Sequence, residues 1–185
     1  MADDKPPQDK PTGAEEPDKP VRFMRQMVSL DYIAHQSPLA RRYGAALAEK
    51  RVVGQRCPKC SLVYVPLRGF CPLCVVEMTE NDEVDVSDHG TITTFTIITP
   101  IQYYGQQERE DYTLASILLD GADQTIGQQR LGSIDNSEVR PGIRVKAVWK
   151  DDLSGAGSGT GGAIEHWEPS GEPDVDPAEF EEHVS

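Results

Sequence analysis

The residues of this sequence most able to do chemistry are its four cysteines, which form two Cys-x-x-Cys pairs, Cys57 with Cys60 and Cys71 with Cys74. Two such pairs joined by a short segment let four thiolates converge on one tetrahedral ion, and Zn²⁺ binds such sulfurs at about 2.3 Å. Four sulfurs leave no coordination position for water or substrate. The spacing therefore predicts a structural zinc ribbon and not a catalytic metal.

Other uses of the cysteines are less favoured or stay open. Paired disulfides need an oxidising compartment, and MADDKPPQDKPTGAEEPDKP has no basic start followed by the apolar stretch of an export signal. A thioredoxin-like redox pair needs one motif in a βαβ context, whereas this sequence has two motifs without that context. Iron in a rubredoxin-like site stays open, because it uses the same four sulfurs.

Elsewhere the sequence shows no arrangement typical of catalysis. The histidines His35, His89, His166 and His183 stand in no recognisable pattern with serine, cysteine or carboxylate residues. The run GAGSGTGG has no lysine and joins no strand to a helix, so it is not a phosphate-binding loop. We therefore expect no catalytic residue in this chain.

The net charge of −13 is concentrated at the two ends of the chain. Residues 1–20 carry three lysines and six acidic residues, and residues 151–185 carry ten acidic residues and no lysine or arginine. The fifteen basic and fifteen acidic residues between them balance. A neutral body disfavours phosphate binding, so a nucleic-acid-binding ribbon and barrel is the alternative function and not the main one.

The middle of the sequence predicts one helix followed by strands. Ser37 can cap a helix that begins with Pro38, and apolar residues recur at helical spacing through residues 37–50. Runs rich in Thr, Ile, Val and aromatic residues predict five short strands, at 90–99, 112–120, 123–131, 143–150 and 163–168. Short strands without long helices between them favour a small barrel of the OB type.

These patterns predict a mainly β fold with a short amino-terminal helix, a four-cysteine zinc ribbon and a five-stranded OB barrel. No run of eighteen apolar residues occurs, so we expect a cytoplasmic protein without membrane contact. The predicted segments are a disordered tail at 1–20, an extension with the helix at 21–52, the ribbon at 53–78, the OB domain at 84–168, and an acidic disordered tail at 169–185.

The order LAEKRVVGQRCPKCSLVYVPLRGFCPLC, GTITTFTIIT and YTLASILLDGADQTIGQQRLGSIDNSEVRPGIRVKAVW resembles a known family over about residues 37–168. This family contains acyl-CoA-associated OB-fold proteins with an amino-terminal rubredoxin-like zinc ribbon. Two departures stand out. Leu67 follows Pro66 where the family often has a second proline, and the extension of residues 1–36 has no family role.

The resemblance implies a non-catalytic, zinc-binding subunit in a hetero-oligomer with a thiolase-like, lipid-transfer-protein-type aldolase or a thiolase. The partner would supply the catalytic residues for retro-aldol cleavage of CoA thioesters, such as steroid side-chain esters in lipid degradation, or for thiolysis. The small chain would support the partner and line the CoA or acyl channel.

Three residues are candidates for contacts with such a ligand or partner. Tyr103 and Tyr104 lie in the segment 100–112, which is long for a hairpin loop, and their side chains combine apolar area with a hydroxyl. Arg68 lies in the ribbon turn, where its guanidinium can pair with a CoA phosphate or a partner carboxylate. Packing of one tyrosine on the barrel, and a structural salt bridge of Arg68, are the alternatives.

Overall fold

The computed structural model describes residues 28, 30, 31, 33, 35–100, 110–153 and 162–180. The chain divides into two units, Met1–Ala34 and His35–Ser185, and the following description concerns the second unit. The predicted tail at 1–20 lies outside the described residues, as do Tyr103 and Tyr104. No helix in the described part of the chain is long and apolar enough to cross a membrane.

The first element is the helix α1 (Pro38–Ala48), which confirms the predicted helix. The side chain of Ser37 accepts a hydrogen bond of 3.1 Å from the Ala40 backbone N–H, as an N-cap residue does. Leu47 is buried and Tyr43 is half-buried against the core, so the helix presents one apolar face to the rest of the unit.

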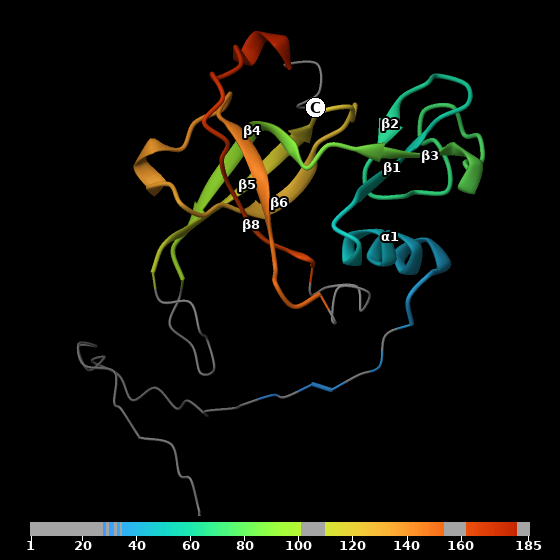
Figure 1. The fold of residues 1–185 in the computed structure, drawn as a ribbon, viewed down its shortest axis with the longest axis horizontal. Coiled ribbons are helices and arrows are strands. Elements are labelled where there is room, and N and C mark those ends of the chain that lie inside the picture. The colour runs from blue at the N-terminus through green and yellow to red at the C-terminus, as the bar shows by residue number, and fades with distance from the viewer. Residues whose placement is uncertain are drawn as a thin grey trace, which may run out of the picture. The chain divides into compact units, whose positions relative to one another are not determined.

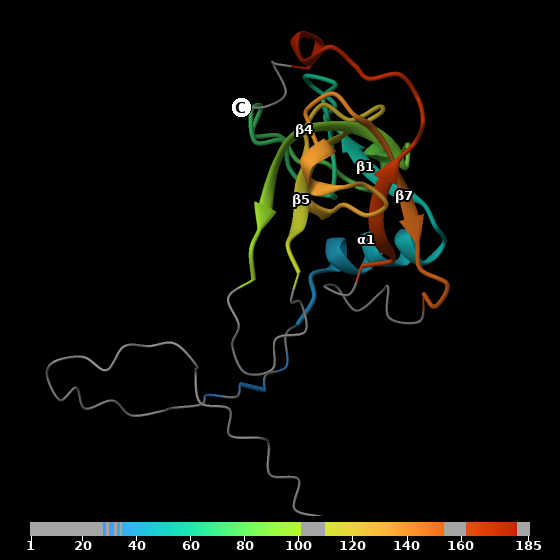
Figure 2. The ribbon, with the colours of Figure 1, turned by 90° about the vertical axis from the view of Figure 1, so that its left-hand side faces the viewer.

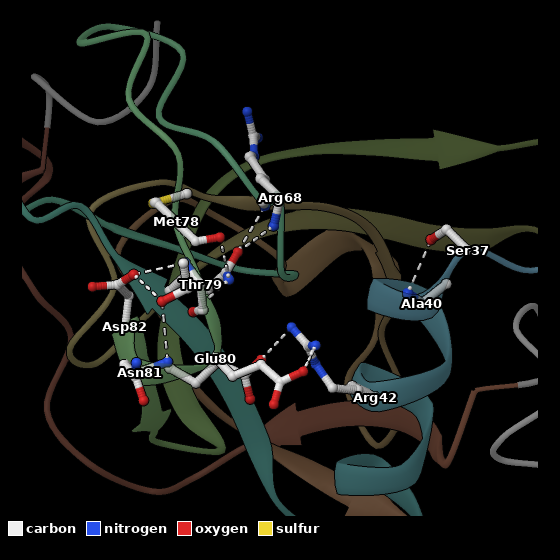
Figure 3. Close-up of polar contacts among 12 residues, drawn as sticks. Ser37, Ala40, Arg42, Arg68, Met78, Thr79, Glu80, Asn81 and Asp82 are labelled. Atoms are coloured by element: carbon white, nitrogen blue, oxygen red, sulfur yellow. Dashed lines mark hydrogen bonds and ion pairs between the residues drawn. The ribbon is translucent and has the colours of Figure 1, made fainter.

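A small antiparallel sheet follows the helix, with the strand order β2–β1–β3. Its strands are β1 (Val52–Arg56), β2 (Val63–Tyr64) and β3 (Glu83–Val86). Figure 1 shows this sheet with α1 next to β1. Thr79 and Asp82 cap the short turn η1 (Glu80–Asp82) before β3, and Arg42 of α1 forms ion pairs with Glu80 and Glu83 (Figure 3). These ion pairs therefore fasten the helix to the segment that follows the cysteine loops and enters β3.

The second sheet has five antiparallel strands, which confirms the predicted number and order. In sheet order the strands are β6 (Ile126–Arg130), β5 (Tyr112–Leu119), β4 (His89–Ile98), β7 (Arg144–Trp149) and β8 (Ile164–Pro169). Leu131 pairs with Trp167, and the Gly132 N–H donates a 2.8 Å hydrogen bond to the Trp167 carbonyl. The two edges of the sheet therefore meet, which closes the sheet into the OB barrel.

The barrel interior is filled by alternate residues of its strands. In β5 every second residue from Thr113 to Leu119 is buried. In β7 Val145 and Ala147 are buried, whereas Arg144 and Lys146 are half-buried. In these two strands the alternation buries one face and leaves the other more exposed.

The ribbon and the barrel share part of one hydrophobic cluster. Leu47 of α1 and the ribbon residues Val52, Val63 and Val65 belong to the same buried cluster as Ile117 of β5. One face of the ribbon therefore packs on the barrel, and the cysteines belong to a separate cluster within the ribbon.

The acidic segment after β8 differs from the prediction of a disordered tail at 169–185. Residues 170–180 follow a defined course that ends in the turn η4 (Pro177–Glu179), drawn in red in Figure 2. The Val175 N–H donates a 2.9 Å hydrogen bond to the Gly142 carbonyl, and Phe180 is buried. Residues 181–185 lie outside the described part of the chain. Composition predicts disorder because it contains no information on tertiary contacts. In the structure, β7 and the loop before it bind this segment.

Candidate metal centre

The two cysteine pairs lie on two loops with the same backbone design. Each loop is closed by two backbone hydrogen bonds of 2.8 to 2.9 Å: Cys57 N to Leu62 O, Ser61 N to Cys57 O, Cys71 N to Val76 O, and Val75 N to Cys71 O. Ser61 and Val75, which follow the second cysteine of each loop, both have left-handed backbone conformations with φ of 64° and 53°. Each loop is therefore a tight turn that aims two sulfurs at one point.

The four sulfurs converge as a zinc ribbon requires. All four Sγ atoms lie within 4.8 Å of one another, and the Sγ atoms of Cys60 and Cys71 are 3.7 Å apart. Sulfurs that bind one ion tetrahedrally at about 2.3 Å lie about 3.8 Å apart. Cys57 and Cys71 are buried, while Cys60 and Cys74 are half-buried. The donor set therefore fits Zn²⁺.

The sulfurs also accept hydrogen bonds that favour their ionised form. Cys57 Sγ accepts from the backbone N–H groups of Lys59 and Cys60, both at 3.4 Å. Cys71 Sγ accepts from the Cys74 N–H at 3.4 Å and lies 3.3 Å from the hydroxyl oxygen of Tyr64. Donors of this kind stabilise a thiolate relative to a thiol.

The pKa values of the thiols differ with their surroundings. Burial of the Cys71 thiol opposes its ionisation, but hydrogen bonds from the Tyr64 hydroxyl and the Cys74 backbone outweigh burial and lower its pKa to about 6. Burial and hydrogen bonds with the neighbouring cysteines raise the pKa of Cys74 to about 12. Thiolates this close repel one another, so all four ionise together only around a positive ion.

A buried glutamine links the chain segment before the second cysteine loop to the segment after it. Gln55 of β1 is fully buried, and its Oε1 accepts hydrogen bonds from Arg68 N at 2.9 Å and Gly69 N at 2.8 Å. Its Nε2 donates to Thr79 O at 3.2 Å and Met78 O at 3.5 Å (Figure 3). Both the oxygen and the nitrogen of the Gln55 side-chain amide are therefore hydrogen-bonded to the segments that flank the second cysteine loop. The sequence motifs gave no indication of this role, because it depends on contacts distant in sequence.

A pair of hydrogen bonds between Val63 and Asp123 joins the ribbon to the barrel. The Val63 N–H donates to Asp123 Oδ2 at 2.7 Å, and the Asp123 N–H donates to the Val63 carbonyl at 3.0 Å. Asp123 belongs to the turn between β5 and β6, so this turn extends the edge of the small sheet. The sequence identifies DGAD as a turn but does not indicate its partner.

Arg68 is exposed on the ribbon, and its backbone is held by Gln55. Its guanidinium carbon lies 5.4 Å from the centre of the Tyr64 ring, and its side chain extends away from the Gln55 bonds (Figure 3). Within residues 35–100, 110–153 and 162–180 it forms no ion pair. Its charge is therefore available to a ligand or partner.

Arg68 lies at a groove between α1, the ribbon and the barrel. Two cavities of about 460 Å³ and 450 Å³ share the lining residues Tyr43, Leu47, Pro66, Arg68 and Gly162. Burial raises the pKa of Tyr43 to about 12, so its hydroxyl stays protonated at neutral pH. The groove thus combines apolar side chains with one cation, Arg68, and several polar groups, among them the Tyr43 hydroxyl, a composition typical of small-molecule sites.

A four-cysteine ribbon packed on a closed five-stranded barrel places the chain among zinc-ribbon OB-fold proteins. Residues 45–77 match the family model of the ChsH2 rubredoxin-like zinc ribbon domain, and residues 83–150 match that of the ChsH2 C-terminal OB-fold domain. The two models together match more than half of the chain. The chain therefore belongs to the ChsH2 family.

Three individual proteins are also similar to this chain. A DUF35 domain-containing scaffold protein of Methanocaldococcus jannaschii is 29% identical over 101 residues, which are 54% of this chain and 67% of that protein. The solved structure of the Ltp2-ChsH2(DUF35) aldolase matches 74% of this chain and 98% of its own chain, with a TM-score of 0.54 and 16% identity. A DUF35-family protein of unknown function from Sulfolobus solfataricus matches 60% of this chain and 78% of its own, with a TM-score of 0.49 and 20% identity. At 16% identity the match to the Ltp2-ChsH2(DUF35) aldolase structure shows similarity of fold alone.

Proposed function

We propose that this chain is a non-catalytic, zinc-binding subunit that associates with a thiolase-like enzyme acting on acyl-CoA thioesters. The observation that carries the proposal is the closed four-sulfur site on a fold shared with the Ltp2-ChsH2(DUF35) aldolase. A site with all positions filled by protein sulfur has no place for a substrate. A relative named as a scaffold protein supports the same function. The catalytic residues for retro-aldol cleavage or thiolysis would then belong to the partner.

The proposed metal ligands are Cys57, Cys60, Cys71 and Cys74. Zinc bound by them would link the two loops and replace the hydrophobic core that so small a sheet lacks. Gln55 fixes the backbone on both sides of the second loop, which orients two of the four ligands. The ribbon would then present a rigid surface to the partner.

The groove beside Arg68 is the part of this chain that we propose to face the acyl-CoA in the complex. Its apolar walls suit an acyl chain or pantetheine arm, and the Arg68 guanidinium suits a phosphate. The protonated Tyr43 hydroxyl offers a hydrogen bond to a carbonyl or amide of the same ligand. Tyr103 and Tyr104 stay candidates for contact with the partner protein.

Co-expression with a thiolase-like partner encoded beside this chain tests the proposal. We expect the two proteins to co-purify, and CoA-ester cleavage to require the partner while the small chain alone shows none. Turnover by the small chain alone would refute the proposal, as would failure of the two proteins to associate. Tight, salt-sensitive binding of single-stranded DNA or RNA would favour the nucleic-acid alternative.

Arg68→Ala tests the ligand groove within that complex. We expect a higher KM for the CoA ester with little change in kcat, because the arginine is proposed to bind the ester and not to react with it. Lys59→Ala, which removes another exposed cation of the ribbon, is the matched control and should leave KM unchanged. Equal KM values for both variants would exclude Arg68 from the site.

A further inference from the structure

The environments of the two buried cysteine sulfurs differ although their loops have the same backbone. The two N–H donors of Cys57 Sγ come from its own loop. Cys71 Sγ receives, besides the N–H of Cys74, the hydroxyl of Tyr64, a residue outside the loop. Among the described residues it is the one cysteine sulfur within hydrogen-bond distance of a hydroxyl.

Burial fixes the position of the Tyr64 hydroxyl. It lies in β2, opposite Gln55 of β1, and is 0% exposed. With Cys57, Cys71 and Met78 it forms the small buried cluster of the ribbon. A buried phenol hydroxyl requires a partner, and the Cys71 sulfur at 3.3 Å is the one that Tyr64 reaches within the described part of the chain.

The direction of this hydrogen bond follows from the chemistry of the two groups. A thiolate bound to a metal ion carries no proton, so it can only accept. A phenol is protonated at neutral pH and can donate. The contact is therefore an O–H···S hydrogen bond from Tyr64 to a metal ligand.

We propose that Tyr64 is a positioning residue of the metal centre. Its hydroxyl strengthens metal binding and, by withdrawing charge from the Cys71 sulfur, lowers the reactivity of that cysteine. This inference rests on metal binding at the four cysteines and is independent of the partner. Four thiolates around one divalent ion leave a net negative charge, and each donor to a sulfur reduces the repulsion. Loss of such an outer hydrogen bond typically weakens metal affinity about 10- to 100-fold.

Arg68 and Tyr112 provide controls that separate the hydroxyl from its ring. The Arg68 guanidinium lies over the Tyr64 ring, so Arg68→Ala removes a neighbour of the ring and leaves the hydroxyl in place. Tyr112 in β5 lies under Arg130, with 4.5 Å between the guanidinium carbon and the ring centre, and is remote from the cysteines in sequence. Tyr112→Phe therefore repeats the chemical change of Tyr64→Phe on a tyrosine that contacts no cysteine sulfur.

Tyr64→Phe tests the inference on the full chain. We expect its Zn²⁺ affinity, measured by competition with a chromophoric chelator, to fall about 10- to 100-fold, and Arg68→Ala and Tyr112→Phe to change it much less. With Co²⁺ in place of Zn²⁺, the sulfur-to-cobalt charge-transfer band should move to lower energy, because the unbonded sulfur gives up electron density more easily. Modification by a thiol reagent should also be faster.

A second probe retains the tyrosine and therefore does not depend on folding of the phenylalanine variant. Replacement of tyrosines by 3-fluorotyrosine makes the phenol a stronger donor, so the Co²⁺ charge-transfer band should move in the opposite direction. An unchanged band in both proteins, with unchanged Zn²⁺ affinity of Tyr64→Phe, would overturn the inference. A wild-type chain that binds one Zn²⁺ but no partner would refute the proposed subunit function and not this inference, whereas a chain that binds no metal would refute both.

Discussion

The zinc ribbon and the OB barrel differ in what fills their interiors. The ribbon's own buried cluster consists of Cys57, Tyr64, Cys71 and Met78. The barrel cluster contains buried apolar side chains from β4, β5, β7 and β8, with Trp167 and Ile117 at 1% and 0% exposure, and half-buried Ile126 of β6 packs against it. Burial of apolar area stabilises the barrel without other help, whereas a three-stranded sheet of short strands cannot bury enough. One chain therefore combines two different means of stabilisation, apolar burial in the barrel and sulfur ligands in the ribbon.

The two regions nevertheless depend on each other at their boundary. Val52 and Val63 of the ribbon pack in the barrel cluster, and Asp123 of the barrel bonds to the β2 edge. We therefore expect the face of the ribbon toward the barrel to be more stable than the cysteine loops. Substitutions in each region and at the boundary can test this difference.

Outside the metal ligands, the largest expected effect of a single substitution lies in the barrel, at Trp167. Trp167→Ala removes a fully buried indole whose Nε1 donates to Gln129 Oε1 at 3.2 Å. We expect the free energy of unfolding to fall by about 3–5 kcal/mol, as measured by chemical denaturation of the metal-loaded chain. Trp167→Phe, which keeps most of the apolar volume, should cost less. Equal losses for the two variants would show that apolar packing does not dominate the barrel.

In the ribbon the largest effect outside the metal ligands is expected at Gln55. Gln55→Ala leaves two N–H groups and two carbonyls of the cysteine-loop flanks without their partner, at a cost of about 2–3 kcal/mol. Hydrogen exchange should increase at Arg68 and Gly69 before it increases in β5. Gln124→Ala, in the turn between β5 and β6, is the control. It should change neither the free energy of unfolding nor the hydrogen exchange at Arg68 and Gly69. Uniform loss of protection across both regions would contradict a separate ribbon core.

A smaller effect is expected at the boundary, at Asp123. Asp123→Ala removes the acceptor of the Val63 N–H, which should cost about 1–2 kcal/mol and raise hydrogen exchange at Val63. Asp123→Asn keeps an acceptor oxygen, so it should retain much of the protection. If the alanine variant leaves Val63 protected, the turn does not hold the ribbon edge.

The smallest effect is expected in the acidic segment after β8, and it depends on pH. The hydrogen bond from Arg144 lowers the pKa of the Glu172 carboxyl below its ordinary value. Glu172 therefore stabilises the folded segment above the ordinary carboxyl pKa, and this contribution is lost as the pH falls through the lowered folded pKa. Hydrogen exchange at Val175, corrected for the intrinsic pH dependence, should increase below pH 4.5. Glu172→Gln should abolish this change; a change that persists would have another origin.

The features that the sequence predicts correctly are those that short stretches encode. Ser37 and Pro38 mark the start of α1, and runs of β-branched residues mark the five barrel strands in order. The cysteine spacing predicts the two sulfur pairs, because each loop is a local turn, and the structure shows that the two pairs converge. Local pattern is therefore enough for element type and for identifying the four cysteines whose sulfurs converge.

Features that depend on distant contacts could not be predicted in this way. Gln55 and Asp123 have no motif, because their partners lie far along the chain. Composition alone predicts a disordered tail at 169–185, yet Arg144 and the Gly142 carbonyl hold the part of it that precedes residue 181. A polar residue acquires such a function only when folding brings its partner near.

Removal of the metal from the full-length chain tests most directly the claim that the four cysteines hold a structural ion. Hydrogen exchange would be followed in β1 and β2 and in β5, before and after exhaustive chelation, with the zinc content measured in parallel. We expect one Zn²⁺ per chain, loss of protection at the cysteine loops on its removal, and retained protection in β5. A metal-free chain whose cysteine loops remain as protected as in the metal-loaded chain would contradict the claim.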